Sequence, residues 1–323
     1  MASVLVSASH FDTLCQDAWK LFTENGIDVI FDPARSFPAY TSDEIEALPQ
    51  REDIVAALIG MDDFWDERKY KALPNLKAVA KFGVGVDNID GELARRYGVK
   101  ALNAPGQNSN AVAELTVGFI IDLLRHVVPL HKDMEKGLWP RFMGSEIKGK
   151  TVGLLGFGAI ARLVAKKLQA FDVRVLAFDL YPNEKAAEEL GITMTTREAV
   201  ITESDIVSIH IPATPETHHL FNRETIATMK DGAYLVNAAR GALVDLDDLA
   251  DALMSGKLAG AALDAFEVEP LPLDAKILKC ENIILTPHTG AETRESYYNV
   301  SMTTAADIIA VLQSREPKFC VNR

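Results

Sequence analysis

The stretch Thr151–Asp179 constrains the possible folds of this chain more than any other part of the sequence. It begins with a short apolar run, which predicts a buried strand, and continues through GFGAIA at residues 156–161. An amphipathic helical pattern follows, and a second strand, Val173–Phe178, leads to Asp179. A strand, a glycine-rich turn, a helix, a strand and an acidic residue in this order are typical of a unit that binds a dinucleotide.

The residues of this stretch suit separate parts of that task. Gly156 permits a tight turn, and Gly158 has no Cβ, so that the backbone can approach a pyrophosphate. The next two residues, Ala159 and Ile160, open the helix, where backbone amides and the positive end of the helix dipole favour phosphate. Asp179 follows Gly158 by about twenty residues and can accept hydrogen bonds from ribose hydroxyls, which predicts NAD rather than NADP. The alternatives are a glycine-rich turn of an ordinary α/β protein and a nucleoside-binding methyltransferase.

Length, charge and cysteine usage narrow the class of protein. A chain of 323 residues with 48% hydrophobic residues predicts two domains with full cores. The net charge of −13 argues against a nucleic-acid or acidic-membrane partner, although a local basic pocket can still hold a small anion. Cys15, Cys280 and Cys320 are scattered, which indicates free thiols in a reducing compartment and no metal site. With no basic leader and with Leu115–Leu124 interrupted by an aspartate, we expect a cytoplasmic protein.

The first hundred residues alternate strand and helix patterns, which predicts a small α/β domain with a parallel sheet. Ala104–Gly106 is the expected hinge, and a long helix then runs from an N-cap at Asn110 towards Gly137, with a kink or break at Pro129. Its broad apolar surface predicts burial between domains or between subunits. The predicted strands are Ser3–Ser7, Ile27–Phe31, Ile54–Ile59, Leu76–Lys81, Asp205–Ile211, Gly232–Asn237, Gly260–Phe266 and Ile283–Thr286, and the other predicted helices are Phe11–Asn25, Asp43–Leu48, Asp66–Leu73, Leu246–Ser255 and Glu295–Ser314.

A second glycine pair, in the segment KFGVGVDNID at residues 81–90, follows the strand at Leu76–Lys81. Ligands bind beyond the carboxyl ends of parallel strands, so the Val84 and Gly85 amides are candidates for holding a substrate carboxylate. The alternative is a plain turn in which glycine supplies a positive φ.

Three ionisable residues stand just beyond strands that follow the dinucleotide motif, namely Arg240, Glu269 and His288. An enzyme that oxidises an alcohol needs a proton acceptor near neutral pH, a cation for the carboxylate and carbonyl oxygen of its substrate, and a group that orients the acceptor. His288 suits the first task, Arg240 the second and Glu269 the third.

The remaining histidines and acids are interpreted more simply. His218 and His219 are sequence neighbours, whose side chains should point apart, so a shared metal ion is not expected. His210 lies in a strand close to Pro212 and either lines the nucleotide site or packs there. Asp245 and the two acids just after it open a helix and are interpreted as structural.

Taken together, these motifs resemble the NAD-dependent D-2-hydroxyacid dehydrogenases. The resemblance runs from about Leu76 to beyond His288, in the order and spacing of that family. It rests on KFGVGVDNID, AVAELTVG, GKTVGLLGFGAIA, IHIPATPETHHL, LVNAARGALVD, GAALDAFEVEP and LTPHTGAE.

The resemblance implies a fold of two Rossmann-like, doubly wound parallel-sheet domains around a cleft, in a chain that forms a homodimer. Residues 1–103 and 292–323 would form the substrate domain, and residues 104–291 the NAD-binding domain. Reversible hydride transfer between NAD and C2 of a D-2-hydroxy acid is the implied reaction. The implied catalytic residues are Arg240, Glu269 and His288, the implied substrate contacts are Lys81, Val84, Gly85 and Arg240, and the implied cofactor contacts are Gly156, Gly158, Ala159, Ile160, Asp179, His210, Pro212, Thr214, Ala238, Arg240, Asp264, His288 and Gly290.

Within that family, the segment WPRFMGSE at residues 139–146 is similar to D-3-phosphoglycerate dehydrogenases. Lys81 stands where those enzymes often have arginine, and lysine cannot make the same bidentate phosphate contact. With the chain ending at residue 323, no serine-binding regulatory domain is expected. The alternatives are a glyoxylate or hydroxypyruvate reductase, a phosphite dehydrogenase, and an NAD-sensing scaffold similar to a corepressor; Glu269 argues against a formate dehydrogenase, which pairs its histidine with glutamine.

Overall fold

A computed structural model of the chain describes residues 2–35 and 39–323, which form two units. The first unit extends over Met1–Asn108 and Glu292–Arg323, and the second over Ser109–Ala291. Ala104, which follows the boundary expected after residue 103, donates a backbone hydrogen bond to the Gly83 carbonyl of the first unit, at 2.8 Å. Among the described helices, none has both the length and the apolar composition needed to cross a bilayer.

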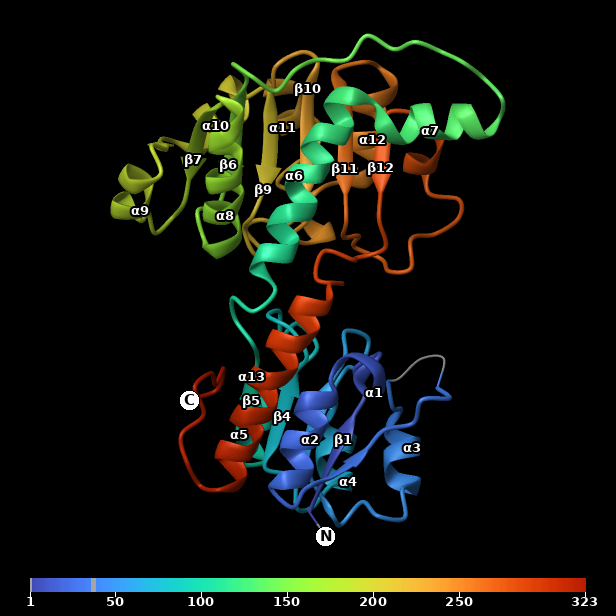
Figure 1. Cartoon of the computed structure of the whole chain (residues 1–323), viewed down its shortest axis with the longest axis vertical. Coiled ribbons are helices and arrows are strands. Elements are labelled where there is room, and N and C mark those ends of the chain that lie inside the picture. Colours follow the sequence, from blue (N-terminus) through green and yellow to red (C-terminus); the bar gives the residue numbers. More distant parts are fainter. Residues whose placement is uncertain (1, 36–38) are drawn as a thin grey trace. The chain divides into compact units, whose positions relative to one another are not determined.

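The first unit is a five-stranded parallel sheet in the order β2-β1-β3-β4-β5, packed between helices (Figure 1). Strands β1, β3 and β4 are almost wholly buried on both faces, which explains their largely apolar sequences. Its strands are β1 (Ser3–Val6), β2 (Asp28–Ile30), β3 (Ile54–Ile59), β4 (Ala78–Lys81) and β5 (Lys100–Leu102), and its helices are α1 (Phe11–Leu14), α2 (Gln16–Glu24), α3 (Ser42–Ala47), α4 (Glu67–Ala72), α5 (Gly91–Arg96) and α13 (Arg294–Leu312).

The end of the chain completes this first unit. Helix α13 begins at an N-cap, Thr293, which accepts a hydrogen bond from the Ser296 amide, and it packs against α2, β4 and β5. Beyond it, the Asn322 side chain accepts from the Ala101 amide and donates to the Val99 carbonyl, both at 2.9 Å. These bonds hold the last residues against the edge strand β5.

The second unit is a seven-stranded parallel sheet in the order β12-β11-β10-β9-β6-β7-β8. The order reverses between β6 and β9, and in doubly wound sheets such a point opens a crevice for ligands. Its strands are β6 (Thr151–Leu155), β7 (Arg174–Phe178), β8 (Thr193–Met194), β9 (Ile206–Ile209), β10 (Ala233–Asn237), β11 (Leu258–Leu263) and β12 (Ile283–Leu285). Its helices are α6 (Ser109–Arg125), α7 (Val127–Glu135), α8 (Ala159–Leu168), α9 (Glu184–Glu189), α10 (Arg197–Glu203), α11 (Arg223–Thr228) and α12 (Leu246–Met254), with 3-10 turns at Gln169–Phe171, Gly241–Leu243 and Lys276–Lys279.

The predicted long helix is wrong in two details. It starts at Ser109, so Asn110 lies inside α6 rather than capping it, and its side chain donates to Glu114 instead. The break falls at His126, whose left-handed backbone (φ 54°) separates α6 from α7, and Pro129 is accommodated in the first turn of α7. The apolar surface of α6 packs against α8, β10, β11 and β12, so the core of its own unit accounts for that burial.

Another predicted helix, Phe11–Asn25, is divided into α1 and α2 at Cys15, where the backbone leaves the helical region (φ −120°, ψ 31°). Neither glycine nor proline stands at this break, so the sequence carries no signal for it. Strand β6 has the predicted bounds, β11 begins two residues earlier than predicted, and β9 is shorter than predicted, so that His210 lies one residue beyond it. The acidic cluster is structural as predicted, because Asp245 caps α12 by accepting from the Asp247 and Asp248 amides.

Candidate active site

The residues expected to act in chemistry follow five neighbouring strands of the second unit. The glycine turn follows β6, His210 follows β9, Arg240 follows β10, Asp264 follows β11 and His288 follows β12. Since all seven strands are parallel, these residues share the carboxyl edge of the sheet, at the arrowhead ends of the strands (Figure 1). The topology therefore gathers residues that are more than a hundred positions apart in sequence.

The glycine turn after β6 has the geometry of a phosphate cradle. Gly156 has φ +93°, and a Cβ there would lie 2.4 Å from the His210 carbonyl oxygen, so no larger residue fits. At Gly158 a Cβ would meet nothing within 4 Å, which leaves the backbone open to a ligand. Ala159 and Ile160 begin α8, where the first-turn amides have no partner within the helix. These features fit the pyrophosphate of a dinucleotide.

Asp179 holds this turn in place. One carboxylate oxygen accepts from the Phe157 amide at 2.7 Å, and the other accepts from the Tyr181 amide at 2.8 Å. A carboxylate has about four acceptor positions, so Asp179 keeps capacity for ribose hydroxyls. The negative charge at this position opposes a 2′-phosphate, which fits NAD.

The His288 imidazole is oriented by Glu269. Its Nδ1 lies 3.0 and 2.9 Å from the two carboxylate oxygens of Glu269, and one of these oxygens also accepts from the Phe266 amide at 2.8 Å. A carboxylate accepts hydrogen bonds, so Nδ1 carries the proton and Nε2 is the nitrogen that can exchange a proton with a substrate. Both side chains are about one-quarter exposed, so this pair is accessible.

Arg240 stands in a turn that the Asn237 side chain closes. Asn237 accepts from the Ala239 amide at 3.0 Å and donates to the Arg240 carbonyl at 2.8 Å, so it fixes the backbone on either side of Ala238. The next residue, Gly241, approaches another loop so closely that a Cβ would lie 1.9 Å from the Phe266 carbonyl carbon. Gly241 thus brings the Arg240 turn against the segment that carries Glu269. The sequence patterns did not identify Gly241 as a residue of the site.

Asp264 is 1% exposed and anchors the loop that carries His288. Its carboxylate accepts from the Thr286 hydroxyl at 2.6 Å, the Thr289 amide at 2.8 Å and the Gly290 amide at 2.7 Å. A Cβ on Gly290 would lie 2.8 Å from this carboxylate, which explains the glycine. In these contacts Asp264 is a positioning residue, and its expected contact with the cofactor stays a prediction.

The segment after β9 contains the residues expected near the adenosine. The His210 Nε2 lies 2.9 Å from the Ser208 hydroxyl, and burial lowers the pKa of His210 to about 4, so its imidazole is neutral at pH 7. The Thr217 hydroxyl donates to the Pro212 carbonyl and accepts from the Thr214 amide, which closes the turn at residues 212–217. Whether His210, Pro212 and Thr214 contact NAD stays a prediction.

The prediction that the side chains of His218 and His219 point apart is wrong. Their rings stack with centroids 3.9 Å apart, and both Nε2 atoms face the carboxylate of Glu267. The reason is the left-handed backbone of His219 (φ 48°), which turns the second ring back alongside the first. Sequence alone gave no sign of this conformation.

In the first unit, the loop after β4 is held by side-chain amides. Asn103 donates to the Val84 carbonyl at 2.8 Å, and Asn88 donates to the carbonyls of Gly60, Met61 and Asp63. Lys81 is 7% exposed, and its ammonium donates to the Gly60 carbonyl at 3.0 Å. Val84 is exposed and Gly85 is half-buried, so the loop presents backbone to solvent, and their binding of a carboxylate stays a prediction.

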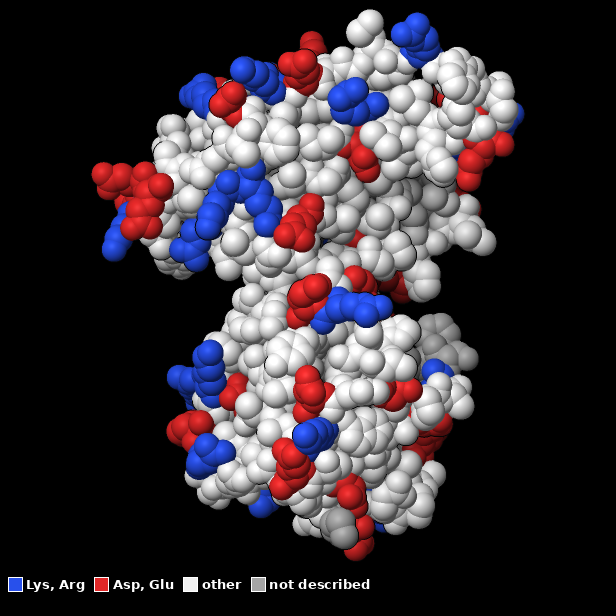
Figure 2. Space-filling view, viewed as in Figure 1, with Lys and Arg blue, Asp and Glu red and all other residues white. Residues whose placement is uncertain are grey.

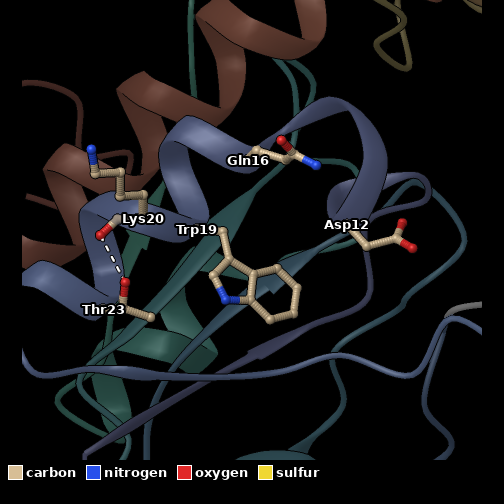
Figure 3. A pocket seen from close by; sticks show the side chains of 5 residues that line it. All are labelled: Asp12, Gln16, Trp19, Lys20 and Thr23. Atoms are coloured by element: carbon tan, nitrogen blue, oxygen red, sulfur yellow. Dashed lines mark hydrogen bonds between the residues drawn. The ribbon is translucent and has the colours of Figure 1, made fainter.

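A shallow hollow of about 420 Å³ lies elsewhere on the first unit, on the outer side of α1 and α2 (Figure 3). It is lined by Asp12, Gln16, Trp19, Lys20 and Thr23, and Thr23 uses its hydroxyl to bond the Lys20 carbonyl. None of the residues expected in chemistry lines it. On the surface, acidic and basic side chains are interspersed over the face that Figure 2 shows.

Comparisons with known proteins agree with this geometry. The family described as D-isomer specific 2-hydroxyacid dehydrogenase, NAD binding domain, matches residues 117–290. A glyoxylate reductase of Thermofilum pendens is 38% identical over 92% of this chain and 88% of its own length. A D-3-phosphoglycerate dehydrogenase of Archaeoglobus fulgidus is 34% identical over 96% of this chain, which spans 58% of that longer relative. The solved structure of the TT0316 protein from Thermus thermophilus is 34% identical, with a TM-score of 0.89 over 99% of both chains.

Proposed function

Because the chain belongs to the D-isomer specific 2-hydroxyacid dehydrogenases, and is therefore an NAD-dependent oxidoreductase, we propose that it reduces small unphosphorylated 2-oxo acids of the glyoxylate and hydroxypyruvate type. When bound, NAD would accept the hydride in oxidation, and NADH would donate it in reduction. The phosphorylated substrate of D-3-phosphoglycerate dehydrogenases is the alternative.

The observation that carries this choice is the charge around the loop after β4. Strands β3 and β4 are paired in parallel, with Ile59 opposite Lys81, so the loops that follow them are neighbours. The loop after β3 contributes an exposed carboxylate, Asp62, and the loop after β4 contributes another, Asp87. Lys81, the cation suggested for a phosphate, is buried against the Gly60 carbonyl. The exposed carboxylate of Asp62, in a loop beside the one that follows Lys81, disfavours a phosphate dianion.

Arg141 gives no support to a phosphate site in the second unit. It is exposed in the segment that leads into the first residue of β6, at the amino edge of the sheet. His288 and Arg240 follow the carboxyl ends of strands, at the opposite edge (Figure 1).

We assign the proton transfer to the His288 and Glu269 pair. In reduction, Nε2 of His288 donates a proton to the oxygen that becomes the hydroxyl, and in oxidation it accepts that proton. Glu269 keeps the proton on Nδ1 and stabilises the imidazolium through both carboxylate oxygens. Arg240 stabilises negative charge on the substrate oxygen and carboxylate, and the Val84 and Gly85 amides donate to the carboxylate.

The test compares hydroxypyruvate with 3-phosphohydroxypyruvate, which differ only by the phosphoryl group, in assays of NADH oxidation. We expect a higher kcat/KM for hydroxypyruvate and measurable turnover of glyoxylate. A preference for the phosphorylated compound would refute the substrate proposal. Silence on both, with NADH still bound, would instead favour phosphite oxidation or an NAD-sensing role.

We also propose that the protein is a cytoplasmic homodimer. The segment between α7 and β6 exposes large apolar side chains, among them Trp139 at 78% and Met143 at 91% exposure, beside Leu138 and Phe142. Exposed apolar side chains gathered in one segment mark surfaces for protein contacts. Light scattering should give twice the chain mass, and Trp139→Asp should lower it; a monomeric mass for the unaltered chain would refute the dimer. The three free thiols support a reducing compartment.

A further inference from the structure

Two histidines and a glutamate outside the catalytic pair converge on the surface of the second unit. The His218 Nε2 lies 3.0 Å from one carboxylate oxygen of Glu267, and the His219 Nε2 lies 2.8 Å from the other. In residues 2–35 and 39–323, this is the one group of three ligand-type side chains whose donor atoms lie within 4.8 Å of one another. The side chains are one-third to one-half exposed, so an ion can reach them.

The arrangement is fixed by the backbone. The His219 amide donates to the Ala242 carbonyl at 2.8 Å, which ties this left-handed residue to the turn after Arg240. The two imidazoles therefore stack at an interplanar angle of 22°, with their Nε2 atoms on the same side. Two ligands are thus held close together before any ion arrives, which lowers the entropic cost of binding.

The spacing suits a four-coordinate ion. Bonds of about 2.0–2.1 Å in a tetrahedron place neighbouring ligand atoms about 3.3 Å apart. The His218 nitrogen lies 3.0 Å from one carboxylate oxygen of Glu267 and the His219 nitrogen lies 2.8 Å from the other, so all three side chains can supply a ligand atom. Because the two rings stack nearly parallel, they must turn toward one another as the ion binds.

Asp245 provides the support that metal-binding histidines commonly have. Its carboxylate lies 3.5 Å from the Nδ1 of His219, on the far side of the ring from Glu267, and it is fixed as the N-cap of α12. A metal-bound imidazole usually donates its other N–H to a carboxylate, which sets the tautomer and orients the ring. Asp245 places a carboxylate 3.5 Å from this nitrogen of His219.

We propose that His218, His219 and Glu267 bind one divalent transition-metal ion of the Zn²⁺, Co²⁺ or Ni²⁺ type, with water completing the coordination. Imidazole ligands favour these ions over Mg²⁺ and Ca²⁺, which prefer oxygen.

The site joins two segments of the active site. His218 and His219 belong to the segment after β9, and Glu267 lies between Phe266 and Glu269 in the segment after β11. Because the Phe266 amide donates to Glu269, an ion held by Glu267 restrains the backbone that positions the catalytic carboxylate. The ion has no part in proton transfer, and its expected effect is to raise the melting temperature.

The experiment uses the full chain without an affinity tag, stripped with EDTA and then transferred to buffer without chelator. Calorimetric titration with ZnCl₂ should show one ion per chain, and Co²⁺ should give the visible absorption bands of a four-coordinate complex. The variant His218→Gln/His219→Gln should lose both signals, since glutamine can donate to Glu267 but offers no imidazole. Asp245→Asn should weaken Zn²⁺ binding by roughly 10-fold to 100-fold.

The matched control is His131→Gln, which removes an exposed histidine that also faces a carboxylate, with Nε2 of His131 3.5 Å from Glu135. It should keep the full Zn²⁺ signal. NADH binding monitors the fold of every variant, and Glu267→Gln replaces the double variant if that one fails to bind NADH. The absence of saturable uptake by the unaltered chain, or uptake retained without these ligands, overturns the proposal.

Discussion

The carboxyl edges of the two parallel sheets carry residues that suit different chemistry. In the second unit, the strands end at ionisable side chains, of which His288 and Glu269 form a hydrogen-bonded pair. In the first unit, β4 ends in a glycine loop that offers backbone, with Lys81 turned into the protein. The same architecture thus supplies proton transfer in one unit and, by our proposal, anion binding in the other.

In each unit, one buried side chain holds a loop beyond the carboxyl ends of the strands. The side chain in the second unit accepts hydrogen bonds, and the one in the first unit donates them. Asp264 collects N–H and O–H donors from the loop after β12, whereas the Asn88 amide donates to three carbonyls of the loop after β3. In the first unit this ties the loop after β4, which contains Asn88, to the carbonyls of the loop after β3. The residue in the anchoring position therefore helps to decide whether backbone acceptors or backbone donors are left for a ligand at that edge of the sheet.

The largest effect should come from His288→Ala. It should lower kcat for reduction of a 2-oxo acid by roughly two to four orders of magnitude, because it removes the general acid and base. The variant should still bind NADH, measured by fluorescence, because the other implied cofactor contacts remain. His131→Ala, at an exposed histidine, is the control. An unchanged kcat would remove proton transfer from this edge of the second unit and with it the contrast between the units.

The second-largest effect should be the fall in the free energy of unfolding when Asp264 is removed. Asp264→Ala leaves the donors of Thr286, Thr289 and Gly290 without their buried acceptor, and each buried unsatisfied group costs about 1–3 kcal/mol. We expect the free energy of unfolding in urea to fall by roughly 3 kcal/mol or more. Asp247→Ala, at an exposed acid on α12, is the matched control. Equal stability of the two variants would contradict the anchoring role.

Removal of the amide anchor should have a smaller effect that falls on substrate binding. Asn88→Ala leaves the carbonyls of Gly60, Met61 and Asp63 without this donor, at a cost of about 1–3 kcal/mol in the free energy of unfolding. Because the loop after β4 is proposed to hold the substrate carboxylate, KM should rise more than kcat falls. A change in kcat alone, measured by steady-state kinetics, would contradict the assignment of carboxylate binding to the first unit.

The features that sequence predicts well here are those with a local or periodic signal. Apolar runs marked most strands, and the order of strand, glycine turn, helix and strand located the turn at Gly156, which Asp179 holds through the Phe157 amide. The pairing of His288 with Glu269 was predictable, since both follow strands of one sheet. The break at Cys15 and the turn at His126 were not, because backbone changes at these residues leave no compositional mark.

The features that sequence missed depend on contacts between distant segments. Gly241 is required by the approach of Phe266, and Asn88 by carbonyls about 25 positions earlier in the chain. The stacking of His218 on His219 depends on one left-handed residue tied to Ala242. Such requirements become visible only when the partner segment is in place.

The effect that is absent at neutral pH and grows only in acid concerns His210, a second histidine at the edge that holds His288. Burial lowers the pKa of His210 from its ordinary value to about 4, so the folded state binds this proton less readily than the unfolded state does. Its contribution to the free energy of unfolding is therefore complete above about pH 6.5 and is lost as the pH falls towards 4. NMR titration should place the midpoint of His210 near pH 4, and His210→Gln should flatten the decline of stability over that window. A midpoint near pH 6.5 would mean that water reaches this imidazole, and the distinction between a neutral histidine after β9 and a proton-transferring one after β12 would fail.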